Sequence, residues 1–302
     1  MNVVLTGATG FIGQKLLNIS CENFDVLALT RKALPERKHK IFSELFDVTV
    51  SDLNNAEVFI HLAGIAHSPL SCDADYELYN TKLTLFLAQT AVKANIKRFV
   101  FVSSIGVNGT STQKKAFSSI ESVSPHNAYS QSKYDAEIGL KKIAQESGLE
   151  LVIVRPTLVY GPNAPGNFGL LTKLVQKLPF LPFGLADNKC DFIAVHNLAD
   201  FLLTCAKHPD AAGHTFLASD GETVSIKGFT NLIARGLNKS IVQLPIPTCL
   251  LRLAARVIGK SSMAEQLLGN LQVDSSNALE VLGWVPPYTM EQAMASLSES
   301  KK

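Results

Sequence analysis

A serine, a tyrosine and a lysine are placed so that they could share one proton-transfer site. Tyr129 and Lys133 lie four residues apart in a segment with helical character, so both side chains face the same side of it. Ser104 directly follows the apolar, strand-like run at 98–103. Free tyrosine, with a pKa of about 10, is a poor base at neutral pH, but a nearby ammonium favours the phenolate. The trio therefore predicts acid–base chemistry at a carbinol or ketone that Ser104 and Tyr129 both bind.

A glycine-rich turn gives a second chemical signal. Gly7, Gly10 and Gly13 follow an apolar strand at 3–6 and open a helical pattern at 11–19. In this context the first glycine permits a tight turn, the second lets the backbone approach a pyrophosphate, and the third allows close packing of helix on strand. The spacing is G-x-x-G-x-x-G rather than the common G-x-G-x-x-G, but its position after the first strand predicts a dinucleotide site.

The end of the second predicted strand, at 25–29, bears on the choice of cofactor. NAD-specific sites usually place an acid there to hold the ribose hydroxyls. This chain has Thr30, Arg31 and Lys32 instead, and the two cations could pair with a 2′-phosphate. The plainer interpretation is a pair of solvated surface cations. The sequence therefore favours NADP(H), with NAD(H) as the alternative.

Strand and helix patterns alternate through the first half of the chain. Apolar runs predict further strands at 58–63, 98–103 and 150–155, with a short one near 48–50, and helical spacing is found at 76–94 and 128–146. This alternation predicts parallel β-α-β units, and hence an α/β fold with a Rossmann-type doubly wound parallel sheet. Because strand ends line the ligand crevice of such a sheet, we expect Ser104 and Tyr129 to converge there.

The composition of the chain changes after residue 156. Residues 156–182 are rich in Pro, Gly and Asn around one helical pattern at 170–178, strand and helix return at 192–195, 197–208 and 215–218, and the rest is mostly helical with a strand near 241–244. We expect a dinucleotide-binding domain of residues 1–160 plus 190–219. Residues 161–189 plus 220–302 would form a smaller, mostly helical substrate-binding lobe.

The overall composition excludes several classes of partner. The 302 residues carry 28 Lys and Arg against 26 Asp and Glu, a net charge of +2, which gives no reason to expect a nucleic acid or membrane partner. We find no export signal and no apolar run long enough to span a bilayer. The five cysteines are scattered without a C-x-x-C pair, so we expect neither a metal site nor disulfides, and a cytoplasmic location.

Taken together, the motifs resemble the extended short-chain dehydrogenase/reductases, in the NAD-dependent epimerase/dehydratase family. The matching segments are TGATGFIG, HLAG, FVSS, YSQSK and RPTLVYGP, followed by DFIAVHNLAD and the closing DSSNALEVLGWVPP. The resemblance implies that Lys133 also touches the nicotinamide ribose and that Asn80 shapes the site. It assigns further positions to the cofactor, namely Phe11, Ile12, Leu62, Ala63, Gly64 and Pro156. It also implies a homodimer through the helices at 76–94 and 128–146, the alternative being their burial within one monomer.

The resemblance extends to the substrate side, with one departure. Gly166-Asn167-Phe168 resembles a loop whose asparagine and backbone hold the nucleotide, although Asn167 could equally be a plain helix N-cap. Cys190 stands where the family often has an arginine that meets the sugar-nucleotide diphosphate, and Lys189 could substitute for it.

Three functions follow from these residues. The first is 4-keto reduction of a UDP-linked deoxy-N-acetylhexosamine by NADPH, which the missing acid after Leu29 favours. The second is 4-epimerisation of a UDP-sugar, UDP-glucose or UDP-N-acetylglucosamine, with tightly held NAD. The third is a non-catalytic dinucleotide sensor, against which the intact trio argues. No acidic pair follows Ser104, so dehydration is not expected. We therefore expect a nucleotide-sugar oxidoreductase or epimerase that transfers hydride at C4.

Overall fold

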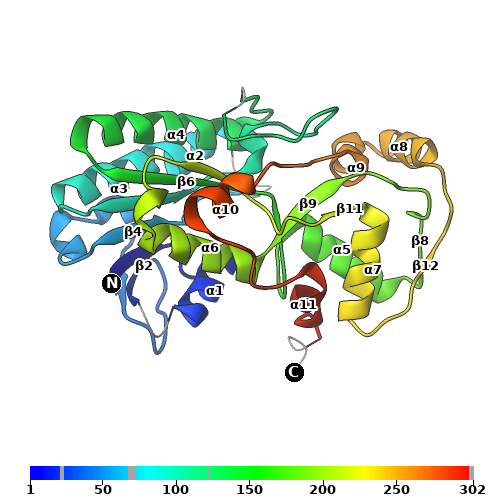
Figure 1. The fold of residues 1–302 in the computed structure, drawn as a ribbon, viewed down its shortest axis with the longest axis horizontal. Coiled ribbons are helices and arrows are strands. Elements are labelled where there is room, and N and C mark those ends of the chain that lie inside the picture. Colours follow the sequence, from blue (N-terminus) through cyan, green and yellow to red (C-terminus); the bar gives the residue numbers. More distant parts are fainter. Residues whose placement is uncertain (21–23, 67–71, 121–122, 299–302) are drawn as a thin grey trace.

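A parallel sheet forms the centre of the computed structural model, which describes residues 1–20, 24–66, 72–120 and 123–298. Its seven strands follow the order β10-β6-β5-β4-β1-β2-β3, and every neighbouring pair is parallel (Figure 1). The strands are β1 (Asn2–Thr6), β2 (Asp25–Thr30), β3 (His39–Ile41), β4 (Val58–His61), β5 (Arg98–Val102), β6 (Glu150–Pro156) and β10 (Thr215–Ala218). The strand order reverses between β1 and β4, and this switch point is where such sheets bind ligands.

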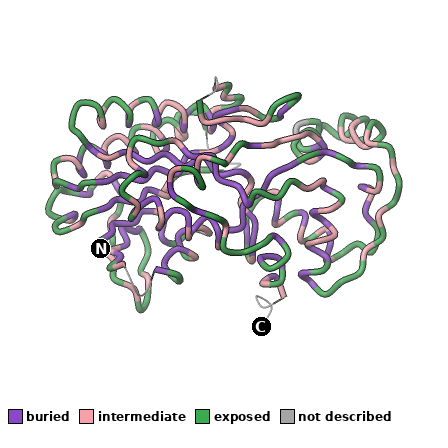
Figure 2. Tube along the Cα trace, in the orientation of Figure 1, coloured by how far each residue is buried: buried purple, intermediate pink, exposed green. Residues whose placement is uncertain are grey.

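Helices cover both faces of this sheet. α1 (Phe11–Ile19) and α6 (Val195–Lys207) lie on one face, while α3 (Leu83–Lys93) and α4 (Ala128–Ser147) lie on the other (Figure 1). The central strands are therefore buried on both sides, and Figure 2 shows them as the purple centre of the molecule. Two-sided burial explains why these strands read as continuous apolar runs. The predicted Rossmann-type fold is confirmed.

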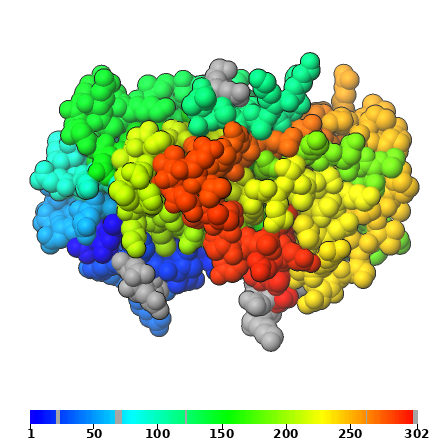
Figure 3. All heavy atoms as spheres, in the orientation of Figure 1, coloured from blue at the N-terminus to red at the C-terminus, as the bar shows by residue number. Residues whose placement is uncertain are grey.

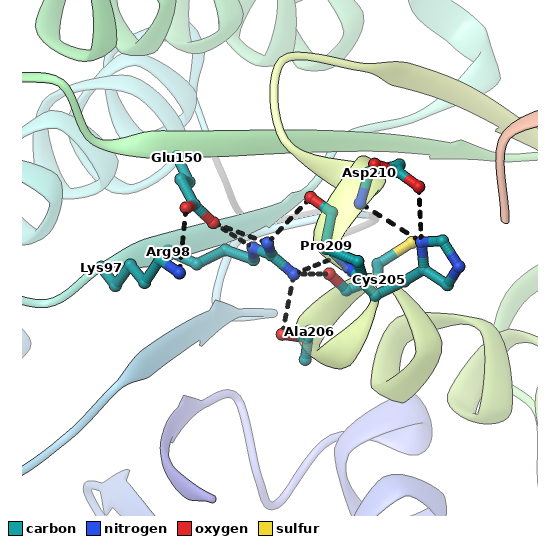
Figure 4. A network of polar contacts seen from close by, with 8 residues as sticks. Lys97, Arg98, Glu150, Cys205, Ala206, Pro209 and Asp210 are labelled. Carbon is teal, nitrogen blue, oxygen red and sulfur yellow. Dashed lines mark hydrogen bonds and ion pairs between the residues drawn. The ribbon is translucent and has the colours of Figure 1, made fainter.

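Arg98 links β5 to β6 and to the C-terminus of α6, which packs against the sheet. The guanidinium of Arg98, in β5, donates to the carboxylate of Glu150 in β6 at 2.6 and 2.9 Å. It also donates to the carbonyls of Cys205 and Ala206, which belong to the last turn of α6, both at 3.0 Å (Figure 4). A buried cation at a helix C-terminus satisfies carbonyls that the helix itself leaves unpaired. This contact holds β5, β6 and α6 in register at the end of the sheet opposite the glycine turn.

The third strand differs from the sequence prediction. The short strand expected near 48–50 is wrong: this region forms two 3-10 helices, η1 (Leu45–Asp47) and η2 (Val50–Leu53), and the strand is β3 at His39–Ile41. The physical reason is local capping, because Asp52 accepts hydrogen bonds from the backbone N–H of Thr49 at 2.8 Å and from its hydroxyl. Such side-chain bonds compete with a sheet ladder.

The helix predicted at 76–94 contains a wider turn. The chain forms α2 (Asp73–Tyr76), then the π-helical stretch η3 (Glu77–Lys82), and then α3. Single π-helical turns within α-helices are frequent at functional sites. Asn80 lies in this stretch and is fully buried.

A smaller lobe extends from the carboxyl end of the sheet and has an apolar core around Tyr160, Phe168 and Phe229. Its helices are α5 (Gly166–Lys177), α7 (Ile226–Gly236), α8 (Thr248–Val257), α9 (Ser261–Leu268) and α11 (Met290–Ala295). Its strands are β7 (Leu158–Tyr160), β9 (Cys190–Ala194) and β11 (Thr223–Val224), which form one sheet, and the pair β8 (Phe180–Leu181) and β12 (Val242–Gln243). α10 (Ser276–Leu282) packs back onto β10. The exact residue limits of the two predicted domains stay a prediction.

Candidate active site

The glycine turn between β1 and α1 is built so that two of its glycines admit no side chain. Gly7 has a φ of +73°, and a Cβ there would lie 2.7 Å from the backbone of Leu62 and Ala63 at the end of β4. A Cβ on Gly13 would lie 2.2 Å from the carbonyl oxygen of Gly7. Gly10 is exposed, and a Cβ there would meet only the Gly7 oxygen, at 3.1 Å. The turn therefore presents a bare backbone at a helix N-terminus, which suits a pyrophosphate.

The segment after β4 brings the predicted Gly64, Asn80 and Lys133 together. A Cβ on Gly64 would lie 2.8 Å from the Asn80 Oδ1 and 3.3 Å from the Lys133 Nζ. The Asn80 amide accepts from the backbone N–H of Ile65 at 2.8 Å and donates to its carbonyl at 3.0 Å. It also donates to the hydroxyl of Ser132 on α4 at 3.0 Å. Asn80 therefore joins the loop after β4 to the helix that carries the tyrosine and lysine.

Lys133 points from α4 into the end of the sheet. Its ammonium donates to the carbonyl of Val102 at 3.0 Å and lies 4.8 Å from the centre of the Phe101 ring. The residue is only 5% exposed. Burial lowers the pKa of Lys133 to about 8, and the carboxylate of Glu137, one helical turn further along, partly opposes this effect.

Tyr129 and Ser104 meet through their hydroxyl groups. The two side chains are hydrogen-bonded, and the Ser104 Oγ also accepts the backbone N–H of Gly106 at 3.1 Å. Burial raises the pKa of Tyr129, while the bond to Ser104 lowers it. The structure therefore brings Ser104, Tyr129 and Lys133 to one edge of the sheet, as the sequence predicted, with the tyrosine in its phenol form. The sequence did not single out Tyr76, whose ring packs edge-on against Tyr129 at 6.2 Å.

A neutral histidine links the end of β1 to this cluster. The Nδ1 of His61 is bonded to the Thr6 hydroxyl at 2.7 Å and its Nε2 to the Thr84 hydroxyl at 2.9 Å. Thr84 in turn donates to the carbonyl of Asn80 at 2.7 Å. Burial lowers the pKa of His61 to about 3. With both ring nitrogens occupied, His61 is structural, and within the described ranges no group of three or more His, Cys, Asp or Glu could hold a metal ion.

Sequence reasoning missed a buried polar network beneath the site. The carboxylate of Glu137 accepts from Arg155 at 2.5 and 2.9 Å and from the hydroxyl of Ser103 at 2.5 Å. Arg155 also donates to the Asn108 Oδ1 at 3.0 Å. Two signals could have revealed it: a glutamate four residues after Lys133, and a lone arginine in the apolar strand at 150–155.

The other predicted cofactor residues differ in how far they are exposed. Arg31 and Lys32 are exposed just after β2, and Pro156 is the buried last residue of β6. By contrast, Phe11 packs against the core of the lobe and Ile12 against the core under the sheet. Any contact that these two residues make with a dinucleotide would therefore come from their backbone or from the exposed part of a half-buried side chain.

The predicted substrate residues lie in the lobe. Asn167 is not the N-cap of α5, which is Pro165; it donates instead to Gln266 of α9 at 2.9 Å. Phe168 as a whole residue is only 1% exposed and belongs to the lobe core, so the structure does not leave it open to a ligand. Lys189 is exposed.

Cys190 cannot replace the arginine expected at its position. Its thiol is buried and donates to the carbonyl of Gly269 at 3.2 Å, and burial raises its pKa to about 11. Neighbouring Asn188 holds the same carbonyl at 3.0 Å. A neutral thiol engaged with the backbone offers no charge to a diphosphate.

Comparison with known proteins identifies the relatives of this chain. Residues 3–219 match the NAD dependent epimerase/dehydratase family. A UDP-glucose 4-epimerase of Vibrio cholerae is 37% identical over 99% of this chain and 95% of its own length. An Escherichia coli O157:H7 protein, N-acetyl-alpha-D-glucosaminyl-diphospho-ditrans,octacis-undecaprenol 4-epimerase, is 24% identical over 97% and 93%.

Solved structures agree on the fold. A UDP-glucuronic acid 4-epimerase from Bacillus cereus, in complex with NAD, superposes with a TM-score of 0.77 at 18% identity, covering 99% of this chain and 98% of its own. In the described part of our chain, no helix is both long enough and apolar enough to cross a membrane. The family match covers well over half of the sequence, and the Vibrio relative spans nearly all of it. The chain is therefore an enzyme of the NAD dependent epimerase/dehydratase family.

Proposed function

We propose that this protein is a UDP-sugar 4-epimerase that works with NAD. The observation that carries the proposal is the hydrogen-bonded Ser104–Tyr129 pair, one helical turn from buried Lys133, in a chain 37% identical to a UDP-glucose 4-epimerase. The sequence predicted a 4-keto reductase first and a 4-epimerase as the alternative, and the comparisons favour the 4-epimerase.

The residues of the glycine turn fit a dinucleotide. At Gly7 and Gly13 the backbone packs against neighbouring backbone so closely that no side chain would fit. Gly10, between them, is exposed to solvent. Bound NAD would take up hydride from C4 of the sugar and give it back.

Tyr129 would move the proton of the C4 hydroxyl. Since burial raises the pKa of Tyr129, the phenol needs help to ionise. Ser104 supplies a hydrogen bond to the same oxygen, and the ammonium of Lys133 supplies positive charge on the same helix face. Tyr129 would accept the proton as the C4 carbinol becomes a ketone and return it when the ketone is reduced from its other face. The net reaction inverts C4 and leaves the sugar at its original oxidation state.

The second candidate, reduction of a keto sugar by NADPH, depends on the exposed cations after β2. Arg31 and Lys32 are the groups that could meet a 2′-phosphate, and the comparisons give the phosphorylated cofactor no support. If Arg31 binds that phosphate, Arg31→Ala weakens NADP(H) by roughly ten- to a hundredfold and leaves NAD(H) unchanged. Equal effects on both cofactors, or none, would mean that Arg31 is only a surface cation.

The proposal includes a homodimer that forms through α3 and α4. Ile138 of α4 is 51% exposed and would be buried in such a dimer. The proposal also includes contacts of Asn167 and Lys189 with the nucleotide sugar, and a cytoplasmic location. The sugar itself would be UDP-glucose or UDP-N-acetylglucosamine.

The state of the purified protein tests the proposal. An epimerase regenerates its NAD in each turnover, so we expect stoichiometric NAD in the protein after dialysis, released on denaturation and measured by chromatography. Protein that is free of dinucleotide, and that binds NADPH more tightly than NADH, would instead support the reductase.

A further inference from the structure

Helix α8 turns its apolar stripe towards solvent. Leu250, Leu253 and Val257 follow the i, i+3, i+7 spacing that places residues on one helix face, and they are 53%, 57% and 80% exposed. Ile258, at the end of the helix, is 67% exposed. An amphipathic helix of a globular protein normally buries this stripe, so its exposure calls for a partner.

The opposite side of α8 already has its contacts. Leu251 packs against the core of the lobe. The guanidinium of Arg252 donates to the carboxylate of Glu265 on α9 at 3.0 Å and to the carbonyl of Leu268 at 3.1 Å. These bonds fix the rotation of the helix, so the outward stripe is a consequence of how α8 is held.

Positive charge accompanies the stripe. Arg256 and Lys260 are exposed beside it. Between Glu222 and Glu265 the chain has no acidic residue, yet it carries six cations: Lys227, Arg235, Lys239, Arg252, Arg256 and Lys260. The net charge of +2 for the whole chain therefore conceals a strongly basic segment that contains the exposed helix.

A second apolar feature lies at the same end of the molecule. Phe180 of β8 and Val242 of β12 are paired across the two strands and are 54% and 55% exposed. β12 leads into α8 through only four residues, and both lie at the tip of the lobe (Figure 1). Figure 3 shows the α8–α9 hairpin, in orange, at the surface there.

We propose that the tip of the lobe, centred on α8, is a docking surface for a lipid bilayer that contains anionic phospholipids. A short helix with exposed leucine and valine, flanked by arginine and lysine, suits the plane of the bilayer interface, where its apolar side enters the headgroup boundary. The cations meet the negative surface potential of such a membrane. A second copy of this chain suits the surface less well, because its own Arg256 and Lys260 would face like charges.

Docking would orient the site relative to the membrane. Gln266 of α9 holds Asn167 at the start of α5, and the backbone of Lys189 is bonded to Asn270, just after α9. The α8–α9 hairpin is thus continuous with the segments expected to bind substrate. This surface would keep the substrate side of the lobe beside the bilayer.

Vesicle flotation tests the proposal with the full-length protein. We expect the wild type to float with vesicles of phosphatidylcholine and phosphatidylglycerol, to stay behind with pure phosphatidylcholine, and to be released by salt. Leu253→Ser/Val257→Ser should lower binding by about tenfold or more. Arg256→Gln/Lys260→Gln should lower it by roughly tenfold.

Matched controls separate a local effect from general loss of apolar surface. Ile41→Ser and Leu279→Ser remove apolar side chains of comparable exposure, 58% and 56%, on β3 and α10, and should float like the wild type. Circular dichroism melts verify that each variant is folded. The proposal is overturned if the wild type does not float, or if the controls lose binding equally. It is also overturned if ultracentrifugation shows self-association that Leu253→Ser/Val257→Ser abolishes, since α8 would then join two copies.

Discussion

Glu137 and Arg155 form an ion pair in the interior of the molecule, with side chains 0% and 2% exposed. The pair joins α4 to β6. Glu137 lies one turn after Lys133, and it also accepts the hydroxyl of Ser103, the neighbour of Ser104. The positions of Ser104 and Lys133, two of the proposed catalytic residues, therefore depend on a buried ion pair that lies next to them.

Removing one charge of this pair should destabilise the fold. Glu137→Gln leaves Arg155 buried without a counter-charge, which costs about 3–5 kcal/mol in the free energy of unfolding. Urea denaturation measures it, with Glu146→Gln as the control, because Glu146 lies on the same helix with a side chain 64% exposed. Glu137→Leu/Arg155→Met should recover most of the loss, since both charges are gone. Equal stability of Glu137→Gln and Glu146→Gln would contradict this account of the pair.

His61 should make stability fall in acid. Burial lowers its pKa to about 3 in the folded protein, against 6.5 for an ordinary histidine, so the unfolded chain binds its proton first. The contribution of neutral His61 is complete above about pH 6.5 and is lost as the pH falls towards 3. The stability difference between wild type and His61→Gln should therefore shrink by roughly 3 kcal/mol between about pH 7 and pH 4.

Urea denaturation at several pH values measures that difference. His39→Gln is the control, because His39 is only partly buried in β3. Parallel curves for wild type and His61→Gln across the whole range would show that His61 does not titrate as proposed.

Gly10 and Gly13 should respond differently to the same small change. Gly13→Ala puts a methyl group 2.2 Å from the Gly7 oxygen, so the turn must shift and the protein should lose stability. Gly10→Ala meets only one atom at 3.1 Å, so the fold should persist while dinucleotide affinity drops by about tenfold or more. Thermal melts and calorimetric titration with NAD separate the two effects. Unchanged affinity in folded Gly10→Ala would mean that the pyrophosphate binds elsewhere.

The sequence predicted those parts of the fold that local pattern alone determines. The two-sided burial of β4, β5 and β6 produces apolar runs, and the spacing of the glycines around the start of α1 is typical of a dinucleotide-binding turn. Placing Ser104 and Tyr129 together needed only the rule that parallel strands end at one edge. The grouping of Ser104, Tyr129 and Lys133 was therefore accessible from residue type, spacing and strand order.

Features that depend on tertiary contacts were not accessible. Asn80, in the π-helical turn, accepts a hydrogen bond from the backbone N–H of Ile65 in the loop after β4. Nothing in the local residue spacing predicts this π-helical turn. The apolar stripe of α8 is visible in the sequence, but only the fold decides that Arg252, rather than the leucines, faces α9. The environment of Cys190 likewise depends on Gly269, which lies far along the chain.

Interconversion of UDP-glucose and UDP-galactose, or of their N-acetylated forms, without added cofactor tests the central claim most directly. The sugar anomeric signals can be followed by NMR for the wild type and for Tyr129→Phe, which keeps the ring and loses the hydroxyl bonded to Ser104. We predict that the wild type reaches the epimer equilibrium, while folded, NAD-containing Tyr129→Phe is slower by at least about a hundredfold. No interconversion by NAD-loaded wild type, or undiminished turnover by Tyr129→Phe, would contradict the proposed epimerase.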